Sequence, residues 1–89
     1  MKAIVSVTGR DRTGIIAAIA SELAACKVNI LDISQTIMGD NFVMIMHVDL
    51  SHSDAAIEKL GERLSAVVDG WGITVHVQHE DLFTHMHRV

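Results

Sequence analysis

The chain contains no proline, only one cysteine and no low-complexity segment. Cys26 has no second thiol with which to form an internal disulfide, which is typical of a reducing compartment. The uncharged apolar runs are far shorter than the ~20 residues of a membrane-spanning helix, so we expect a soluble protein. Met1 and Lys2 lead straight into a predicted strand and not into a signal peptide, and we therefore predict a cytoplasmic location.

Positive charge is also scarce. The 7 Lys and Arg residues are scattered and are outnumbered by 11 Asp and Glu, which gives a net charge of −4. Nucleic-acid binding requires clustered positive charge, so this balance argues against such a partner. The 49% of hydrophobic residues suffices for one globular domain over residues 1–89, in which residues 80–89 form a C-terminal tail. Domains of this size are marginally stable alone, and we expect a partner subunit.

The most informative segment runs from Val7 to Ile16, where an apolar strand meets a polar loop flanked by glycines and the chain restarts as a helix. The first amides of a helix lack intrahelical acceptors and lie at the positive end of its dipole, so they can hold a carboxylate or phosphate. Gly14 lets a ligand approach this backbone closely. The spacing from Gly9 to Gly14 imitates a nucleotide-binding loop, but Ile15 and Ile16 replace its Lys and Ser/Thr. Nucleotide hydrolysis is thereby excluded.

Hydrophobic periodicity predicts six elements along the chain. They are a strand at 2–8, a helix at 13–26, strands at 29–38 and 42–50 around a turn at 39–41, a helix from 57 up to 70 and a strand at 73–78. The spacing of Ser51 and Asp54 is typical of a side-chain cap at the start of the second helix.

This β-α-β-β-α-β order predicts an α+β fold, a ferredoxin-like sandwich in which a four-stranded antiparallel sheet carries both helices on one face. On the other face we expect polar side chains mixed with apolar ones, which would form a patch of the kind that marks interfaces. This outer face is predicted to hold Ser6, Thr8, His47, Asp49, Thr74, His76 and Gln78 together with Ile4, Val43 and Ile45. Small side chains on the outer side of the first helix serve helix propensity or favour a subunit contact, namely Ala17, Ala18, Ala20, Ser21, Ala24 and Ala25.

The segment Asp11-Arg12-Thr13-Gly14-Ile15-Ile16-Ala17, followed by Val28-Asn29-Ile30, resembles the opening signature of ACT domains. In that family an acidic or amide residue, Arg, Pro, Gly and an aliphatic pair precede one helix, and Gly-or-Val, Asn and Ile follow it. The resemblance covers the whole chain, because ACT domains share the β-α-β-β-α-β order. Residues 32–36, residues 42–46 and the tail are similar to a group of small free-standing ACT proteins related to the regulator of the glycine cleavage operon.

The resemblance implies a regulatory module that pairs with a second copy and binds an amino acid at the interface. It implies ligand contacts at Asp11, Gly14, Ile15 and Asn29, and Arg12 of the same signature joins these candidates. Thr13 stands in place of the usual proline and is able to cap the helix. Asp11 stands where several amino-acid-binding members carry an amide, and its carboxylate would repel a ligand carboxylate but hold an ammonium group.

Each candidate also has a structural interpretation. Asp11 would stabilise the helix dipole from the first turn, and Arg10 and Arg12 would be solvated loop charges. Asn29 would end a turn in a left-handed conformation. Cys26 closes an apolar helical stripe without a nearby base, which favours a buried inert thiol over a nucleophile.

Histidines are concentrated near the C-terminus, at positions 76, 79, 85 and 87. Imidazole is the commonest metal ligand, but this spacing is not that of a zinc motif. We therefore favour exposed or interface histidines and predict no metal site. Leu82 and Phe83 are expected to dock on the subunit surface or across a dimer.

These observations predict a homodimeric regulatory module that is not an enzyme and whose loop from Gly9 to Ile15 binds an amino acid or a related carboxylic acid. Without an attached enzyme domain, it would act by contacting another regulatory protein or an enzyme. The alternative is a protein–protein interaction module with no small-molecule ligand. Catalysis ranks last because no nucleophile–base pair or carboxylate dyad is present. No catalytic residue, cofactor, nucleic acid or membrane is predicted to take part.

Overall fold

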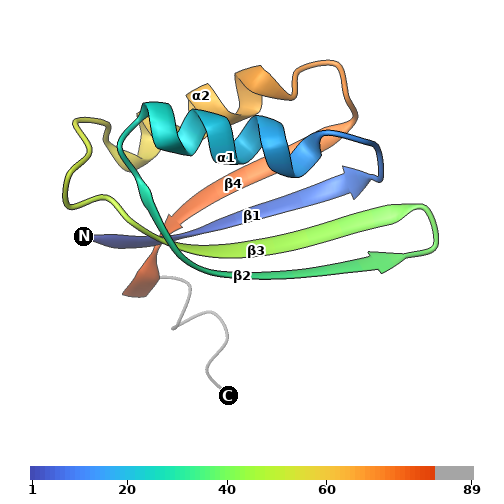
Figure 1. Cartoon of the computed structure of the whole chain (residues 1–89), viewed down its shortest axis with the longest axis horizontal. Coiled ribbons are helices and arrows are strands. Elements are labelled where there is room, and N and C mark those ends of the chain that lie inside the picture. The colour runs from blue at the N-terminus through green and yellow to red at the C-terminus, as the bar shows by residue number, and fades with distance from the viewer. Residues whose placement is uncertain (82–89) are drawn as a thin grey trace.

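The structure is a computed structural model that describes residues 1–81. Its elements are β1 (Lys2–Arg10), α1 (Ile15–Ala25), β2 (Asn29–Met38), β3 (Asn41–Asp49), α2 (Ile57–Val67) and β4 (Ile73–His79). The strands form one antiparallel sheet in the order β2-β3-β1-β4. Both helices lie on the same face of this sheet (Figure 1). The predicted ferredoxin-like α+β fold is confirmed.

The core fills the space between the helices and the inner face of the sheet. Alternate residues of β1 and β3 point toward the helices, so Val5 pairs with Met46 and both are fully buried. The helices contribute residues at helical spacing, namely Ile15, Ile19, Leu23, Leu60 and Leu64. Full burial of such a side chain contributes about 1.5–3 kcal/mol, so this single layer holds both helices to the sheet.

Helix α1 begins two residues later than predicted. Its N-cap is Gly14, whose φ of +93° lies in the left-handed region and cannot continue a right-handed helix backward to Thr13. No side chain caps the helix, so the capping role expected of Thr13 is wrong. Because the helix begins only at Ile15, its first turn holds no acidic residue. The interpretation of Asp11 as a first-turn anion is therefore also wrong.

The predicted capping arrangement of Ser51 and Asp54 is also wrong. Helix α2 begins at Ile57 after Ala56, and no side chain caps it. The Ser51 hydroxyl instead donates to Asp49 Oδ1 at 2.6 Å, and the Ser51 N–H donates to the same oxygen at 2.9 Å. These two bonds lower the pKa of Asp49. Asp49 therefore organises the turn after β3.

The strand register places all the residues expected on the outer face there, because Ser6 pairs with Ile45 and His76. The apolar patch is smaller than expected: Ile45 is 37% exposed but Ile4 only 8%. Glu80, just beyond β4, is hydrogen-bonded to Nε2 of His47 on β3. Since β1 lies between these two strands, this contact passes over the end of β1 that carries Ile4.

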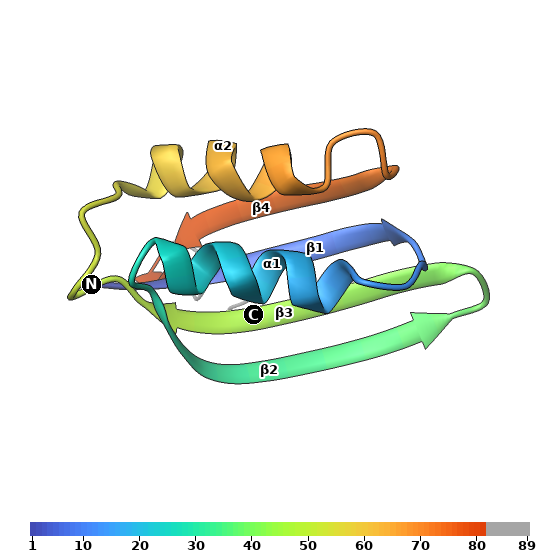
Figure 2. The same ribbon diagram turned by 45° about the horizontal axis from the view of Figure 1, so that its top comes forward.

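The main exposed apolar surface lies on the edge strand β2. Ile33 and Ile37 point to the helix side of the sheet, since their partners on β3 are the buried Met46 and Phe42. Helix α1 lies over the middle of the sheet and leaves β2 uncovered (Figure 2). Ile33 is therefore 41% and Ile37 57% exposed, and the neighbouring Met38 is 64% exposed. This apolar edge was not predicted from the sequence.

Candidate ligand-binding site

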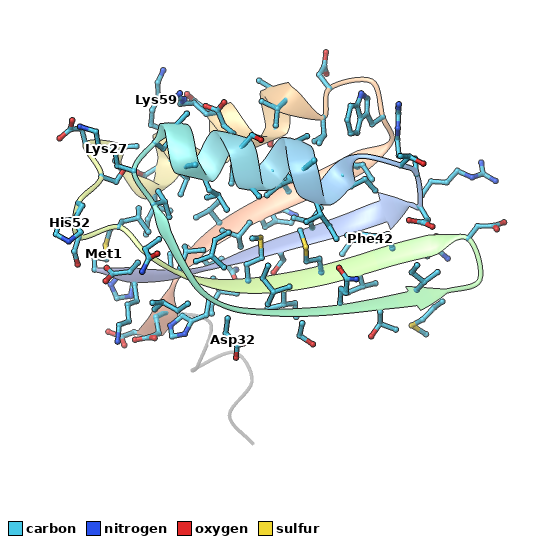
Figure 3. The ribbon with its side chains drawn as sticks, in the orientation of Figure 1. Met1, Lys27, Asp32, Phe42, His52 and Lys59 are labelled. Carbon is cyan, nitrogen blue, oxygen red and sulfur yellow. The ribbon has the colours of Figure 1, made fainter. Side chains whose placement is uncertain are left out.

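A cavity of about 450 Å³ opens between the start of α1 and the end of β2. Residues 11–17 form one wall, and Gln35 and Ile37 of β2 with Phe42 of β3 form the other. Phe42 is nearly buried, and Figure 3 shows it between the start of α1 and β3. A volume of this size falls within the range of about 300–1,000 Å³ that is usual for small-molecule sites.

The backbone at the start of α1 supplies hydrogen-bond donors to the cavity. The first helical bond runs from the Ala18 N–H to the Gly14 carbonyl at 2.9 Å. Within residues 1–81, the N–H groups of Ile15, Ile16 and Ala17 consequently have no acceptor. A Cβ built on Gly14 would meet no atom within 4 Å, so the backbone here faces open space. Unpaired amides at the positive end of a helix are suited to an anionic group.

The other part of the lining is apolar. Ile16 on α1 is 39% exposed and Ile37 on β2 is 57% exposed, and both line the cavity. Gln35 of β2, which carries a side-chain amide, also lines the cavity. The cavity therefore combines backbone hydrogen-bond donors with apolar side chains from both walls, as is typical of sites for small amphiphilic molecules.

Most of the predicted site residues meet in this cavity, because Asp11, Arg12, Gly14 and Ile15 all line it. The Ile15 side chain is only 1% exposed and belongs to the core, so its backbone N–H is the group available to a ligand. Asn29 is placed elsewhere. It lies at the opposite end of β2, where it pairs with Asp49, and it does not line the cavity.

The loop that carries Asp11 is anchored on both sides. The Asp11 N–H donates to the Asp40 carbonyl at 2.8 Å, which joins the loop to the turn between β2 and β3. On the other side, the Arg12 guanidinium lies over the Trp71 ring, with Cζ 4.0 Å from the ring centroid. Arg12 is therefore held by an aromatic side chain and not solvated on all sides. Arg10 at the end of β1 is exposed.

Several residues at this site were missed by sequence reasoning, namely Ile16, Ala17, Gln35, Ile37, Phe42 and Trp71. For Ile37 and Phe42 the turn predicted at residues 39–41 was a usable signal. A hairpin that turns there pairs these two residues and brings the end of β2 toward the loop before α1. For Trp71 the sequence held no such signal. Its place beside Arg12 depends on β4 pairing with β1.

Other candidate chemistry is sparse in the described part of the chain. Residues 1–81 bring together no group of three or more His, Cys, Asp or Glu side chains that could hold a metal ion. His85 and His87, like Leu82 and Phe83, lie outside the described residues. Cys26 is buried, and its burial raises the pKa of the thiol. None of the helices formed by residues 1–81 is long and apolar enough to cross a membrane.

Comparisons with known proteins agree with this structure. The family model described as ACT domain matches residues 2–78. The UPF0237 protein of Methanopyrus kandleri is 50% identical over 88 residues, which cover 99% of this chain and 98% of that protein. The solved structure of an ACT domain protein from Streptococcus pneumoniae has a TM-score of 0.79 and 31% identity, with 93% of each chain covered. A protein assigned as a glycine cleavage system transcriptional repressor shares the fold, with a TM-score of 0.70, 18% identity and coverage of 86% of this chain and 44% of that one.

The topology and these matches define a small ferredoxin-like α+β domain of regulatory type. The chain belongs to the ACT domain family. The resemblance carried by residues 11–17 and 28–30 is thus confirmed.

Proposed function

We propose that this chain is a non-catalytic regulatory module that binds an amino acid in the cavity between α1 and β2, close to a homodimer interface. The cavity carries the proposal. Its unpaired helix N–H groups can donate hydrogen bonds to a carboxylate, and the side chains of Ile16 and Ile37 can contact a hydrophobic side chain. An amino acid with an apolar side chain, such as leucine, matches both kinds of lining.

Asp11 favours an amino acid over a simple carboxylic acid. Asp11 lines the same cavity as the helix amides, and a carboxylate at this position can pair with the ligand ammonium group. A ligand without that group would bring its own carboxylate near Asp11 with no compensating charge. We therefore expect the ligand to carry both charges.

The edge strand β2 supports pairing with a second copy of this chain. Edge strands are commonly protected by Lys or Pro, but residues 29–38 contain neither, and Asp32 is their only charged side chain. If two copies of β2 pair antiparallel about Gln35, Ile33 lies opposite Ile37 of the second copy and Asp32 lies opposite Met38. Apolar side chains of the two copies then lie opposite each other, and the two Asp32 carboxylates do not. A self-complementary two-fold interface requires such a pattern.

This pairing would also complete the cavity. Ile37 lines the cavity and is more than half exposed in the single chain. In the pair, Ile33 of the second copy covers Ile37, so the apolar wall loses its contact with water. The ligand and the interface would then stabilise each other. We further propose that the module acts in the cytoplasm by contacting another regulatory protein or an enzyme.

The proposal is tested by titration calorimetry against the twenty amino acids, with L-leucine amide as a control that lacks the carboxylate. We expect saturable binding of L-leucine or a similar apolar amino acid and none of the amide. Sedimentation should give a mass near twice 9.7 kDa at micromolar concentration. A dimer that binds none of these compounds would instead support an interaction module without a ligand, and a monomer would contradict the interface.

A further inference from the structure

The described part of the chain ends beside the outer face of the sheet, on the side opposite the helices. Glu80 is hydrogen-bonded to Nε2 of His47 on β3, and these two side chains are only 38% and 32% exposed. The Asp81 N–H donates to Nδ1 of His79 at 3.1 Å. Asp81 is thus fixed beside the outer face. The terminal segment, residues 82–89, lies outside the described residues and continues the chain from this point.

The middle of the outer face carries a short apolar strip. It consists of Ile4 on β1 with Val43 and Ile45 on β3, and Ile45 is 37% exposed. Ile4 pairs with His47, so the strip begins where Glu80 contacts that histidine. The neighbouring positions of β2 and β4 on this face are polar, namely Ser34, Thr36, Thr74 and His76. Such a strip is too narrow for packing of one whole sheet on another, but it can hold a few apolar side chains of an extended segment.

The composition of the terminal segment matches this face. Leu82 and Phe83 come first, and Arg88 with two histidines follows, without any Asp or Glu. The outer face offers Asp32 on β2, which Figure 3 shows on the side of the strand away from the helices. Asp32 has no cation within ion-pair distance in the part of the chain that the structure describes. The charges of the segment and of the face are therefore complementary.

The terminal segment is also long enough to cross the outer face. Its 8 residues span up to about 26 Å when extended, whereas adjacent strands are ~4.8 Å apart, so only about 10 Å separates β1 from β2. We propose that the terminal segment covers the outer face of its own sheet. Leu82 and Phe83 lie on the strip of Ile4 and Ile45, and Arg88 lies on the side of Asp32.

This arrangement gives the hydrogen bond between His47 and Glu80 a role, because it holds the start of the terminal segment at the beginning of the apolar strip. The segment then shields Ile45 from water and from other proteins. The cavity between α1 and β2 lies on the helix side of the sheet, so this inference does not depend on the proposed ligand.

The first test measures how accessible position 45 is in the whole chain. In a Cys26→Ala background, the thiol of Ile45→Cys is alkylated by iodoacetamide with and without the neutral substitutions Leu82→Ser and Phe83→Ser. A covered thiol reacts only when the cover opens, so we expect these substitutions to raise the rate about threefold to tenfold. An unchanged rate would overturn the proposal.

The control for this test is Ala24→Cys in the same background. Ala24 is exposed on α1, on the other side of the sheet, so its thiol should react at the same rate with and without the two serine substitutions. A rise at both positions would show a general loosening of the fold and would overturn the proposal.

The second test locates the terminal segment by nuclear magnetic resonance. A nitroxide is attached to Thr84→Cys in the Cys26→Ala chain, and it broadens the signals of nearby methyl groups. We expect the methyl signals of Ile45 to be broadened several-fold more than those of Ile16, which is 39% exposed but lies on α1. Equal broadening of the two would overturn the proposal.

A mixed sample identifies which chain supplies the cover. Chains that carry the nitroxide are mixed with isotope-labelled chains that do not. We expect Ile45 of the isotope-labelled chains to keep its signal, because each segment covers its own sheet. Strong broadening of Ile45 in the mixture would make the occupant a segment of a second copy and would overturn the proposal.

Discussion

Gly9 packs so closely against Gly72 that a Cβ at position 9 would lie 2.3 Å from the Gly72 carbonyl oxygen. It would also lie 2.9 Å from Cα of Ile73, the residue with which Gly9 pairs across β1 and β4. Both obstacles belong to the backbone and cannot rotate away. The end of β1 is therefore fixed against the connection that carries Trp71.

Replacing Gly9 by alanine should destabilise the fold strongly. We expect Gly9→Ala to lower the free energy of unfolding by about 2–4 kcal/mol, because the backbone of two strands must separate to admit the methyl group. Chemical denaturation monitored by circular dichroism measures this loss. Gly39→Ala is the matched control: its φ is +64° but no atom lies within 4 Å of the added Cβ, so it should cost only about 1 kcal/mol. Equal losses in the two variants would contradict the close contact.

Gly14→Val should abolish amino-acid binding while the far-ultraviolet circular dichroism stays nearly native. The added side chain would occupy the open space at Gly14 through which the proposed ligand would bring its carboxylate to the helix amides. The φ of +93° also makes valine unfavourable here, at a cost of about 1–3 kcal/mol. Gly39→Val places comparable strain in the turn between β2 and β3 and should retain binding. Unchanged affinity in Gly14→Val, measured by calorimetry, would place the site elsewhere.

Ile37→Lys should convert the proposed dimer to a monomer at micromolar concentration. The substitution puts a charge on the exposed apolar edge, opposite Ile33 of the second copy in the proposed pairing. Analytical ultracentrifugation of both proteins measures the change. Ile45→Lys makes the same substitution on the outer face of β3 and should leave the mass unaltered. A stable dimer of Ile37→Lys would move the interface away from β2.

Cys26 should be unreactive in the folded protein. Its side chain is nearly buried with Sγ 3.7 Å from Oε2 of Glu22, and burial raises the pKa of the thiol above its ordinary value of 9.0. Iodoacetamide at mildly alkaline pH should therefore label the chain in concentrated urea and not in buffer. The unfolded chain ionises first as the pH rises, so the contribution of this thiol to stability is lost above that ordinary value. Rapid labelling of the folded protein would show that the thiol is accessible.

The fold could be predicted because its strands and helices have clear hydrophobic periods. Ala3, Val5 and Val7 alternate as a half-buried strand must, and the structure buries all of them. Helix boundaries were less predictable, since the φ of Gly14 is set by the loop and not by the apolar stripe that follows it.

The candidate site was predictable only where it is local in sequence. Asp11 to Ile15 are neighbours in one loop, so a single motif was enough to group them. The wall formed by Ile37 and the contact of Trp71 with Arg12 depend on which strands are adjacent, which the local pattern does not specify. The exposure of β2 depends on the lateral position of α1 over the sheet, and this too is a tertiary property.

The hydrogen bond from the Asp11 N–H to the Asp40 carbonyl bears on the size of molecule that the cavity can accept. Beside it, Arg10 pairs with Asn41, so the loop before α1 and the turn after β2 are joined through two successive positions. The two walls of the cavity are thus connected at one end, and neither wall can move away from the other as a rigid body. Room for a larger ligand has to come from rotation of Ile16, Gln35 and Ile37. Selectivity among amino acids would then be set by the rotamers of these side chains, and substitutions there would change ligand preference without altering the backbone.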